Sequence, residues 1–112
     1  MSKMESERWI DICALEEIPL RGARVVKTPR GCIALFRTID NEVFALDDKC
    51  PHRGGPLSQG IVHGRSVTCP LHNMVVSLET GSADGDDEGS VQTRRARLAE
   101  GRVHLMLHPG GV

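Results

Sequence analysis

The chain has 112 residues, a length typical of one domain, so the sequence predicts a single domain over residues 1–112. Its 14 basic and 15 acidic residues give a formal net charge of −1, which argues against nucleic acid or an anionic membrane as a partner. Residues 1–8 are polar and charged, unlike a secretory signal, and no apolar run approaches the roughly 20 residues of a membrane-spanning helix. A cytoplasmic protein is therefore expected.

Short apolar runs between turn-forming residues indicate strands along the whole chain. In chain order, strands are expected at residues 9–14, 24–27, 32–39, 42–46, 61–62, 66–68, 74–78, 91–98 and 102–107, with one helical turn at 15–18. Asp40-Asn41 is a two-residue hairpin signal, and Glu100-Gly101 is a second turn. Many short strands at close spacing predict an all-β fold, an antiparallel sandwich or barrel.

The four cysteines fall into two groups. Thiols in a chain that is not exported are expected to stay reduced, so a disulfide framework is not predicted. Cys13 and Cys32 lie among apolar residues and are predicted to be small buried hydrophobic residues. The other two lie in expected loops that also carry histidines, as Cys50-Pro51-His52 and Cys69-Pro70-Leu71-His72.

These two loops make a candidate metal site, and its ligands would be Cys50, His52, Cys69 and His72. Thiolate and imidazole are ligands that zinc and iron–sulfur centres select. Two cysteines and two histidines fit a structural zinc ion, or a Rieske cluster in which two histidines replace two cysteines on one of two irons. Each loop supplies one Cys and one His, which favours the two-iron cluster, because each loop then reaches both irons. A zinc-stabilised interaction module stays open as an alternative.

The residues around the ligands add a resemblance. Residues 50–57 and 69–72 resemble the two cluster loops of Rieske ferredoxin-like domains. Cytochrome bc-type Rieske proteins carry one further cysteine in each loop, where this chain has Gly55 and Leu71. The resemblance implies a Rieske-type antiparallel β-sandwich with a small inserted cluster-binding subdomain near residues 48–78. It also implies one [2Fe–2S] cluster per chain, which passes single electrons.

Segments outside the loops resemble one family more closely, the small subunit of NAD(P)H-dependent nitrite reductase. The matching segments are residues 9–13, 17–19, 33–37, 43–46, 60–64, 67–73 and 77–83. This resemblance implies a large partner subunit with flavin, a [4Fe–4S] cluster and sirohaem, which reduces nitrite to ammonium in nitrate assimilation. A free Rieske ferredoxin that supplies an oxygenase is the alternative. No facial triad for mononuclear iron and no dinucleotide-binding fingerprint is present, so the chain is expected to carry electrons without being an enzyme by itself.

Three other polar features are expected to play no part in metal binding. No other potential ligand stands at a metal-site spacing from His63 in the sequence, so His63 is interpreted as a turn residue. The acidic run at residues 84–88 is interpreted as a solvated loop, with the docking of a basic partner as the alternative. Strand alternation places Arg95 and Arg97 on one face and Arg94 on the other, with an exposed face as the leading interpretation and a subunit contact as the alternative.

Overall fold

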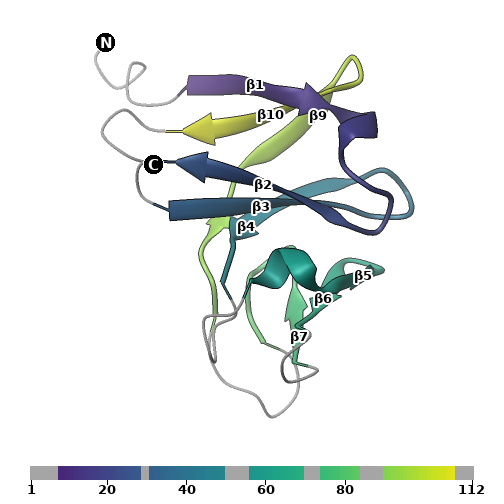
Figure 1. The fold of residues 1–112 in the computed structure, drawn as a ribbon, viewed down its shortest axis with the longest axis vertical. Coiled ribbons are helices and arrows are strands. Elements are labelled where there is room, and N and C mark those ends of the chain that lie inside the picture. The colour runs from purple at the N-terminus through teal and green to yellow at the C-terminus, as the bar shows by residue number, and fades with distance from the viewer. Residues whose placement is uncertain (1–7, 29–30, 50–55, 70–73, 84–89, 108–112) are drawn as a thin grey trace.

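Three antiparallel sheets make up the computed structural model, which describes residues 8–28, 31–49, 56–69, 74–83 and 90–107 (Figure 1). The central sheet has the order β2 (Ala23–Thr28), β3 (Gly31–Arg37), β4 (Val43–Asp47) and β8 (Thr93–Arg94). A second sheet has the order β1 (Arg8–Ala14), β10 (Arg102–Leu107) and β9 (Ala96–Ala99). The third and smallest sheet has the order β5 (Ile61–His63), β6 (Ser66–Thr68) and β7 (Val75–Ser77). The expected all-β antiparallel fold is confirmed.

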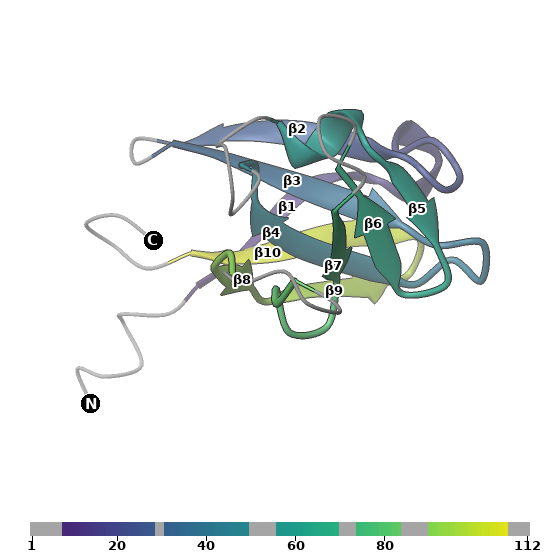
Figure 2. The same cartoon turned by 90° about the horizontal axis from the view of Figure 1, so that it is seen from below.

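Two single 3-10 turns complete the described structure, η2 (Leu15–Glu17) and η3 (Leu57–Gln59). The first confirms the helical turn expected after residue 14. The second packs against β2 and β3 and lies beside the small sheet, as the view from below shows (Figure 2). In the parts of the chain that the structure describes, no helix is long and apolar enough to cross a bilayer.

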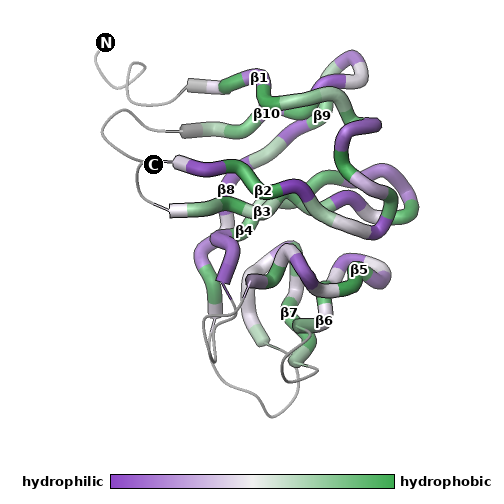
Figure 3. Tube along the Cα trace, viewed as in Figure 1, coloured by the Kyte–Doolittle hydropathy of each residue, from purple (hydrophilic) through white to green (hydrophobic). Residues whose placement is uncertain are grey.

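Strand β3 carries an apolar run (Figure 3), and residues 33–36 of this run are buried between two hydrophobic cores. Side chains alternate along a strand, so Ile33 and Leu35 face one core while Ala34 and Phe36 face the other. We call the first the upper core; it also contains Cys13, Ile18, Ala45, Val103 and Leu105. The second, the lower core, also contains Leu46, Leu57, Val62, Val67, Cys69, Met74, Val76, Leu78 and Val91. The lower core therefore joins the central sheet to the small sheet.

The two expected hairpins are present, but only one has the expected turn. Glu100 and Gly101 both have positive φ, 53° and 77°, as a tight two-residue hairpin turn requires. The other connection spans residues 38–42, so β3 ends earlier and β4 begins later than the sequence predicts. The cause is Thr38, whose hydroxyl oxygen accepts a 3.0 Å hydrogen bond from the N–H of Glu42 and holds a wider turn. Asn41 takes the left-handed conformation in that turn, with φ of 64°.

The single strand expected at residues 91–98 is wrong, because the chain changes sheets at Arg95. Residues before it pair with β4 as β8, and residues after it pair with β10 as β9. Arg94 is half-buried, and its Nε lies 3.0 Å from Asp47 Oδ1. Arg97 instead lies over the ring of Trp9, with 4.4 Å between the guanidinium carbon and the ring centroid. The arginines thus make separate contacts within the chain.

Arg65 ties the small sheet to the β3–β4 connection. Its guanidinium donates two hydrogen bonds to the carboxylate of Glu42, at 2.9 and 2.6 Å, and one to Glu79 at 3.1 Å. These bonds hold the pKa of the Glu42 carboxyl below its usual value, with the hydrogen bond from Arg65 as the main cause. The groups are exposed, so we ascribe to them a part in orientation and little net stability.

The two cysteines outside the candidate site differ in exposure. Cys13 is 1% exposed in the upper core, which confirms the expected buried position. Cys32 is exposed, so the expectation that it is buried is wrong. It shares a face of β3 with Ala34 and Phe36. However, it lies near the first residue of the strand, where the lower core no longer covers that face. There it lines a surface cavity.

This difference predicts a difference in thiol reactivity. Burial raises the pKa of the Cys13 thiol, so both access and thiolate content are low there. We expect iodoacetamide to modify Cys32 in the folded holoprotein and to modify Cys13 only after unfolding, as mapped by peptide mass spectrometry. The Cys32→Ser protein is the control for site assignment. Equal rates at Cys13 and Cys32 in the folded protein would contradict the assignment of Cys13 to a closed core.

Candidate metal centre

The first expected ligand loop begins directly after β4, and its first stem is fixed to the central sheet. The N–H of Asp47 donates a 2.9 Å hydrogen bond to the carbonyl of Gln92, and the N–H of Asp48 donates one of 2.9 Å to the carbonyl of Cys32. The chain is therefore held on two sides immediately before Lys49. Hydrogen bonds between backbone groups therefore set the position at which the loop leaves the sheet, and these bonds do not depend on side-chain identity.

The second stem of this loop lies in η3. Leu57 is fully buried in the lower core, and the N–H of Gly60 donates a 2.8 Å hydrogen bond to its carbonyl, closing the turn. Between them, Ser58 donates two hydrogen bonds to the Asp48 carboxylate. The two stems are thus joined to each other as well as to the core.

The second expected ligand loop begins at Cys69, directly after β6. Cys69 is fully buried in the lower core, the same core that holds Leu57. Its N–H donates a 2.7 Å hydrogen bond to the carbonyl of Met74, where the chain enters β7. That bond closes the second loop at its base. Leu57 and Cys69 share one core, so the lower core holds both the second stem of the first loop and the start of the second loop.

Gly60 sets how closely the two loop stems approach. Ile61 pairs with Thr68 across β5 and β6, and Gly60 is the residue before this pair. A Cβ at position 60 would lie 2.3 Å from the carbonyl oxygen of Thr68, which is closer than a real Cβ can come. Only glycine allows this approach of two backbones. Thr68 is followed at once by Cys69, so the approach positions a candidate ligand.

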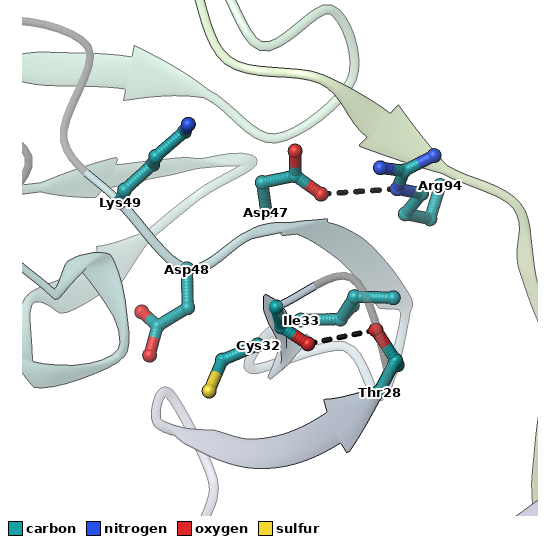
Figure 4. Close-up of a pocket in the computed structure, with 8 residues that line it drawn as sticks. Thr28, Cys32, Ile33, Asp47, Asp48, Lys49 and Arg94 are labelled. Carbon is teal, nitrogen blue, oxygen red and sulfur yellow. Dashed lines mark hydrogen bonds and ion pairs between the residues drawn. The ribbon is translucent and has the colours of Figure 1, made fainter. Parts of the chain in front are cut away.

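A small polar cavity of about 110 Å³ lies beside the first stem (Figure 4). Its lining residues include Thr28, Cys32, Asp47, Asp48, Lys49 and Arg94. In the close-up, the Asp48 carboxylate and the Cys32 thiol lie on one side, while Asp47 points to Arg94 on another. Two carboxylates line the cavity, and their contacts differ. Asp47 accepts a hydrogen bond from Arg94, whereas Asp48 accepts one from Ser58, on the other stem of the loop.

Among the four predicted ligands, Cys69 is the one that the structure describes. Cys50, His52 and His72 lie outside the described residues, as does the acidic run at 84–88. His63 lies on β5, where its Nε2 is 2.6 Å from the hydroxyl oxygen of Thr68. The contacts that sequence reasoning missed are those of Asp48 and Ser58, ten residues apart. The only signal for them in the sequence is an acceptor just before the first loop and a donor just after it.

One observation on the described residues supports an iron–sulfur cluster at this site. Cys69 is a fully buried thiol at the start of a loop that its own N–H closes, so the sulfur is held out of bulk water on a fixed backbone. Burial beside Leu57, Val67 and Met74 supplies the apolar shell that limits solvent at a metal centre. Cysteine sulfur is the donor that iron–sulfur clusters require.

Comparisons with known proteins identify the family of the chain. The family model of the Rieske-like [2Fe–2S] domain matches residues 8–106. The ferredoxin component of the naphthalene 1,2-dioxygenase system of Pseudomonas aeruginosa is 36% identical over 78 residues, which are 70% of this chain and 74% of that protein. The ferredoxin subunit of the 3-phenylpropionate/cinnamic acid dioxygenase of Photorhabdus laumondii is 45% identical over 74 residues, 64% of this chain and 68% of that protein.

A solved structure from Mycobacterium tuberculosis, provisionally assigned as an NADH-dependent nitrite reductase small subunit, has a TM-score of 0.79 and 30% identity. The match covers 89% of this chain and 95% of that one. Together with the family model, these relatives decide the choice between zinc and iron–sulfur in favour of a Rieske [2Fe–2S] cluster, and they make the chain an electron carrier of an oxidoreductase system. The chain belongs to the Rieske-like [2Fe–2S] domain family.

Proposed function

We propose that Cys50, His52, Cys69 and His72 hold the cluster, with the two cysteines on one iron and the two histidines on the other. The support is the mixed ligand order in the sequence, the buried position of Cys69, and the family of the chain. When bound, such a cluster accepts and donates one electron at a time. In this proposal, the unit near residues 48–78 carries the ligands, and the two larger sheets of the single domain hold that unit.

We further propose that the chain is the small subunit of an NAD(P)H-dependent nitrite reductase. The observation that carries this proposal is the match to the M. tuberculosis structure, which extends over 95% of that chain at 30% identity. The partner would be a large subunit with flavin and sirohaem, which performs the reduction of nitrite to ammonium. The proposal places both subunits in the cytoplasm, where NAD(P)H is available.

A second candidate function is that of a free ferredoxin for an oxygenase. It is favoured by the ferredoxin components of dioxygenase systems, which reach 36% identity over 70% of this chain and 45% over 64%. These matches are higher in identity but shorter than the structural match. In both functions the chain delivers single electrons, and the two differ in the protein that receives or supplies them.

Reconstitution with purified partners tests the choice. We expect the chain to bind the large subunit of an NADH-dependent nitrite reductase and to raise the rate of NADH-dependent ammonium formation from nitrite. In a parallel assay, the chain replaces the ferredoxin of a naphthalene dioxygenase system, with its reductase and oxygenase, and product formation is measured. The His72→Ala chain, which we expect to lack the cluster, is the control in both assays, because it differs from the wild type by one proposed ligand.

The outcomes separate the two functions. Stimulation of nitrite reduction by the wild-type chain, and none by the His72→Ala chain, supports the small-subunit role. Support of the dioxygenase with no binding to the large subunit would overturn that role in favour of the ferredoxin.

A further inference from the structure

One carboxylate joins the two stems of the first loop. Asp48 Oδ1 accepts a 2.7 Å hydrogen bond from the backbone N–H of Ser58, and Oδ2 accepts a 2.9 Å bond from the Ser58 hydroxyl. Both bonds are partly buried. Hydrogen bonds to an ionised acceptor are shorter and stronger than neutral ones, and two from one residue also fix its orientation. We call this pair of contacts the Asp48–Ser58 clamp.

Each half of the clamp is attached to a rigid part of the fold. The backbone of Asp48 is bonded to Cys32 on β3, within the central sheet. Ser58 lies in η3 beside Leu57, which is fully buried in the lower core with Cys69. The clamp therefore connects the central sheet to the element that carries the small sheet. It joins the two ends of a stretch of nine residues, 49–57. Without the clamp, each end would be held only by the structural element next to it.

We propose that Asp48 is a positioning residue for the [2Fe–2S] cluster, acting through Ser58 to fix the first ligand loop. This proposal rests on the proposed ligands, because Cys50 and His52 fall inside the clamped stretch. Groups that orient metal ligands without touching the metal lower the cost of arranging those ligands. The bases of the two loops are closed differently, the second by a backbone bond from Cys69 to Met74 and the first by the Asp48 side chain. A substitution can therefore open the first loop alone.

A graded set of variants tests the clamp. Asp48→Ala removes both bonds, and Ser58→Ala removes one, since its backbone N–H remains. Asp48→Asn can keep both, because its amide oxygen accepts from the N–H of Ser58 and its NH₂ donates to the hydroxyl. Loss of such orienting contacts typically costs 10–100-fold in metal affinity, so we expect Asp48→Ala to release iron to a chelator roughly tenfold faster than wild type. Ser58→Ala should be intermediate and Asp48→Asn close to wild type. We also expect broader EPR lines in the dithionite-reduced Asp48→Ala protein.

Two controls separate positioning from general destabilisation. Val103→Ala weakens the upper core, which contains neither Asp48 nor Ser58. The rate of iron release from this variant is compared with that from Asp48→Ala, each measured at the same number of degrees below its own Tm. Asp47→Asn makes the same kind of change one residue away and affects the bond to Arg94 instead. Both control proteins should keep the EPR line width of the wild type.

Equal release from Asp48→Ala and Val103→Ala, or no recovery in Asp48→Asn, would overturn the proposal. If Asp48→Ala does not fold, Ser58→Ala and Asp48→Asn still give the comparison. A failure of the ligand assignment looks different, because the wild-type protein would then lack the Rieske EPR signal or the His72→Ala protein would retain it. Failure of the clamp alone leaves a normal wild-type signal and unaltered release in the Asp48 variants.

Discussion

We expect the His72→Ala protein to lack the mixed nitrogen–sulfur EPR signal that dithionite reduction gives the wild-type protein. Alanine has no donor atom, so the proposed ligand set would lose one of its two imidazoles. Imidazole ligation at one iron is what distinguishes Rieske clusters from all-cysteine clusters. Iron and acid-labile sulfide, measured on protein purified anaerobically, should fall together with the EPR signal. The same analysis distinguishes a cluster from zinc, which brings neither iron nor sulfide.

His63→Ala is the matched control, because it removes the same kind of side chain at a position outside the proposed ligand set, on β5. His63 is exposed, and its Nε2 lies 2.6 Å from the hydroxyl oxygen of Thr68, so the change removes one exposed hydrogen bond. We expect the His63→Ala protein to keep the wild-type EPR signal and iron content. A normal Rieske signal in His72→Ala together with its loss in His63→Ala would exchange the two residues in the ligand set. A normal signal in both would remove His72 from it.

The strands were predictable where their residues are locally patterned. The run from Ile33 to Phe36 predicts a strand, and the β9–β10 turn follows from Glu100-Gly101. The division at Arg95 was not predictable, because no glycine or proline marks it. It arises from pairing partners far apart in the sequence, as Arg94 pairs with Ala45 while Ala96 pairs with Leu105. Local propensity carries no information about which sheet a short strand joins.

The candidate site also has one part that the sequence predicts and one part that depends on the folded structure. Cysteines and histidines at the spacing of a metal site are visible in the sequence, so the sequence alone identifies Cys69 as a candidate ligand, and the structure adds that it is buried. The contacts that hold the loops could not be named, because a carboxylate–serine bond across ten residues depends on how the loop closes. Cys32 was misassigned for a related reason. Its apolar neighbours predict burial, but its exposure depends on where the lower core stops covering β3.

Gly60→Ala is expected to have the largest effect on stability among the substitutions considered. The new Cβ would lie 2.3 Å from the carbonyl oxygen of Thr68 and 2.9 Å from Val67 Cγ2. A backbone carbonyl cannot rotate away as a side chain can, so β6 must move from β5. Overpacking that forces backbone shifts costs about 3 kcal/mol. For a domain of this size that loss lowers Tm by roughly 12 °C, as measured by calorimetry.

Gly64→Ala separates this steric effect from the general cost of replacing glycine. Gly64 lies in the β5–β6 turn with φ of 59°, and nothing lies within 4 Å of the position of a Cβ there. The Gly64→Ala substitution therefore costs about 1 kcal/mol of stability, through the backbone conformation alone, and it leaves the strands in place. Gly60→Ala displaces Thr68, which is bonded to Cys69, so it should also lower the iron and sulfide content of the purified protein, whereas Gly64→Ala should not. Equal Tm and equal iron content in the two variants would show that the close approach at Gly60 does not position Cys69. A selective loss of iron in Gly60→Ala would link the closest backbone contact of the small sheet to the binding of the cluster.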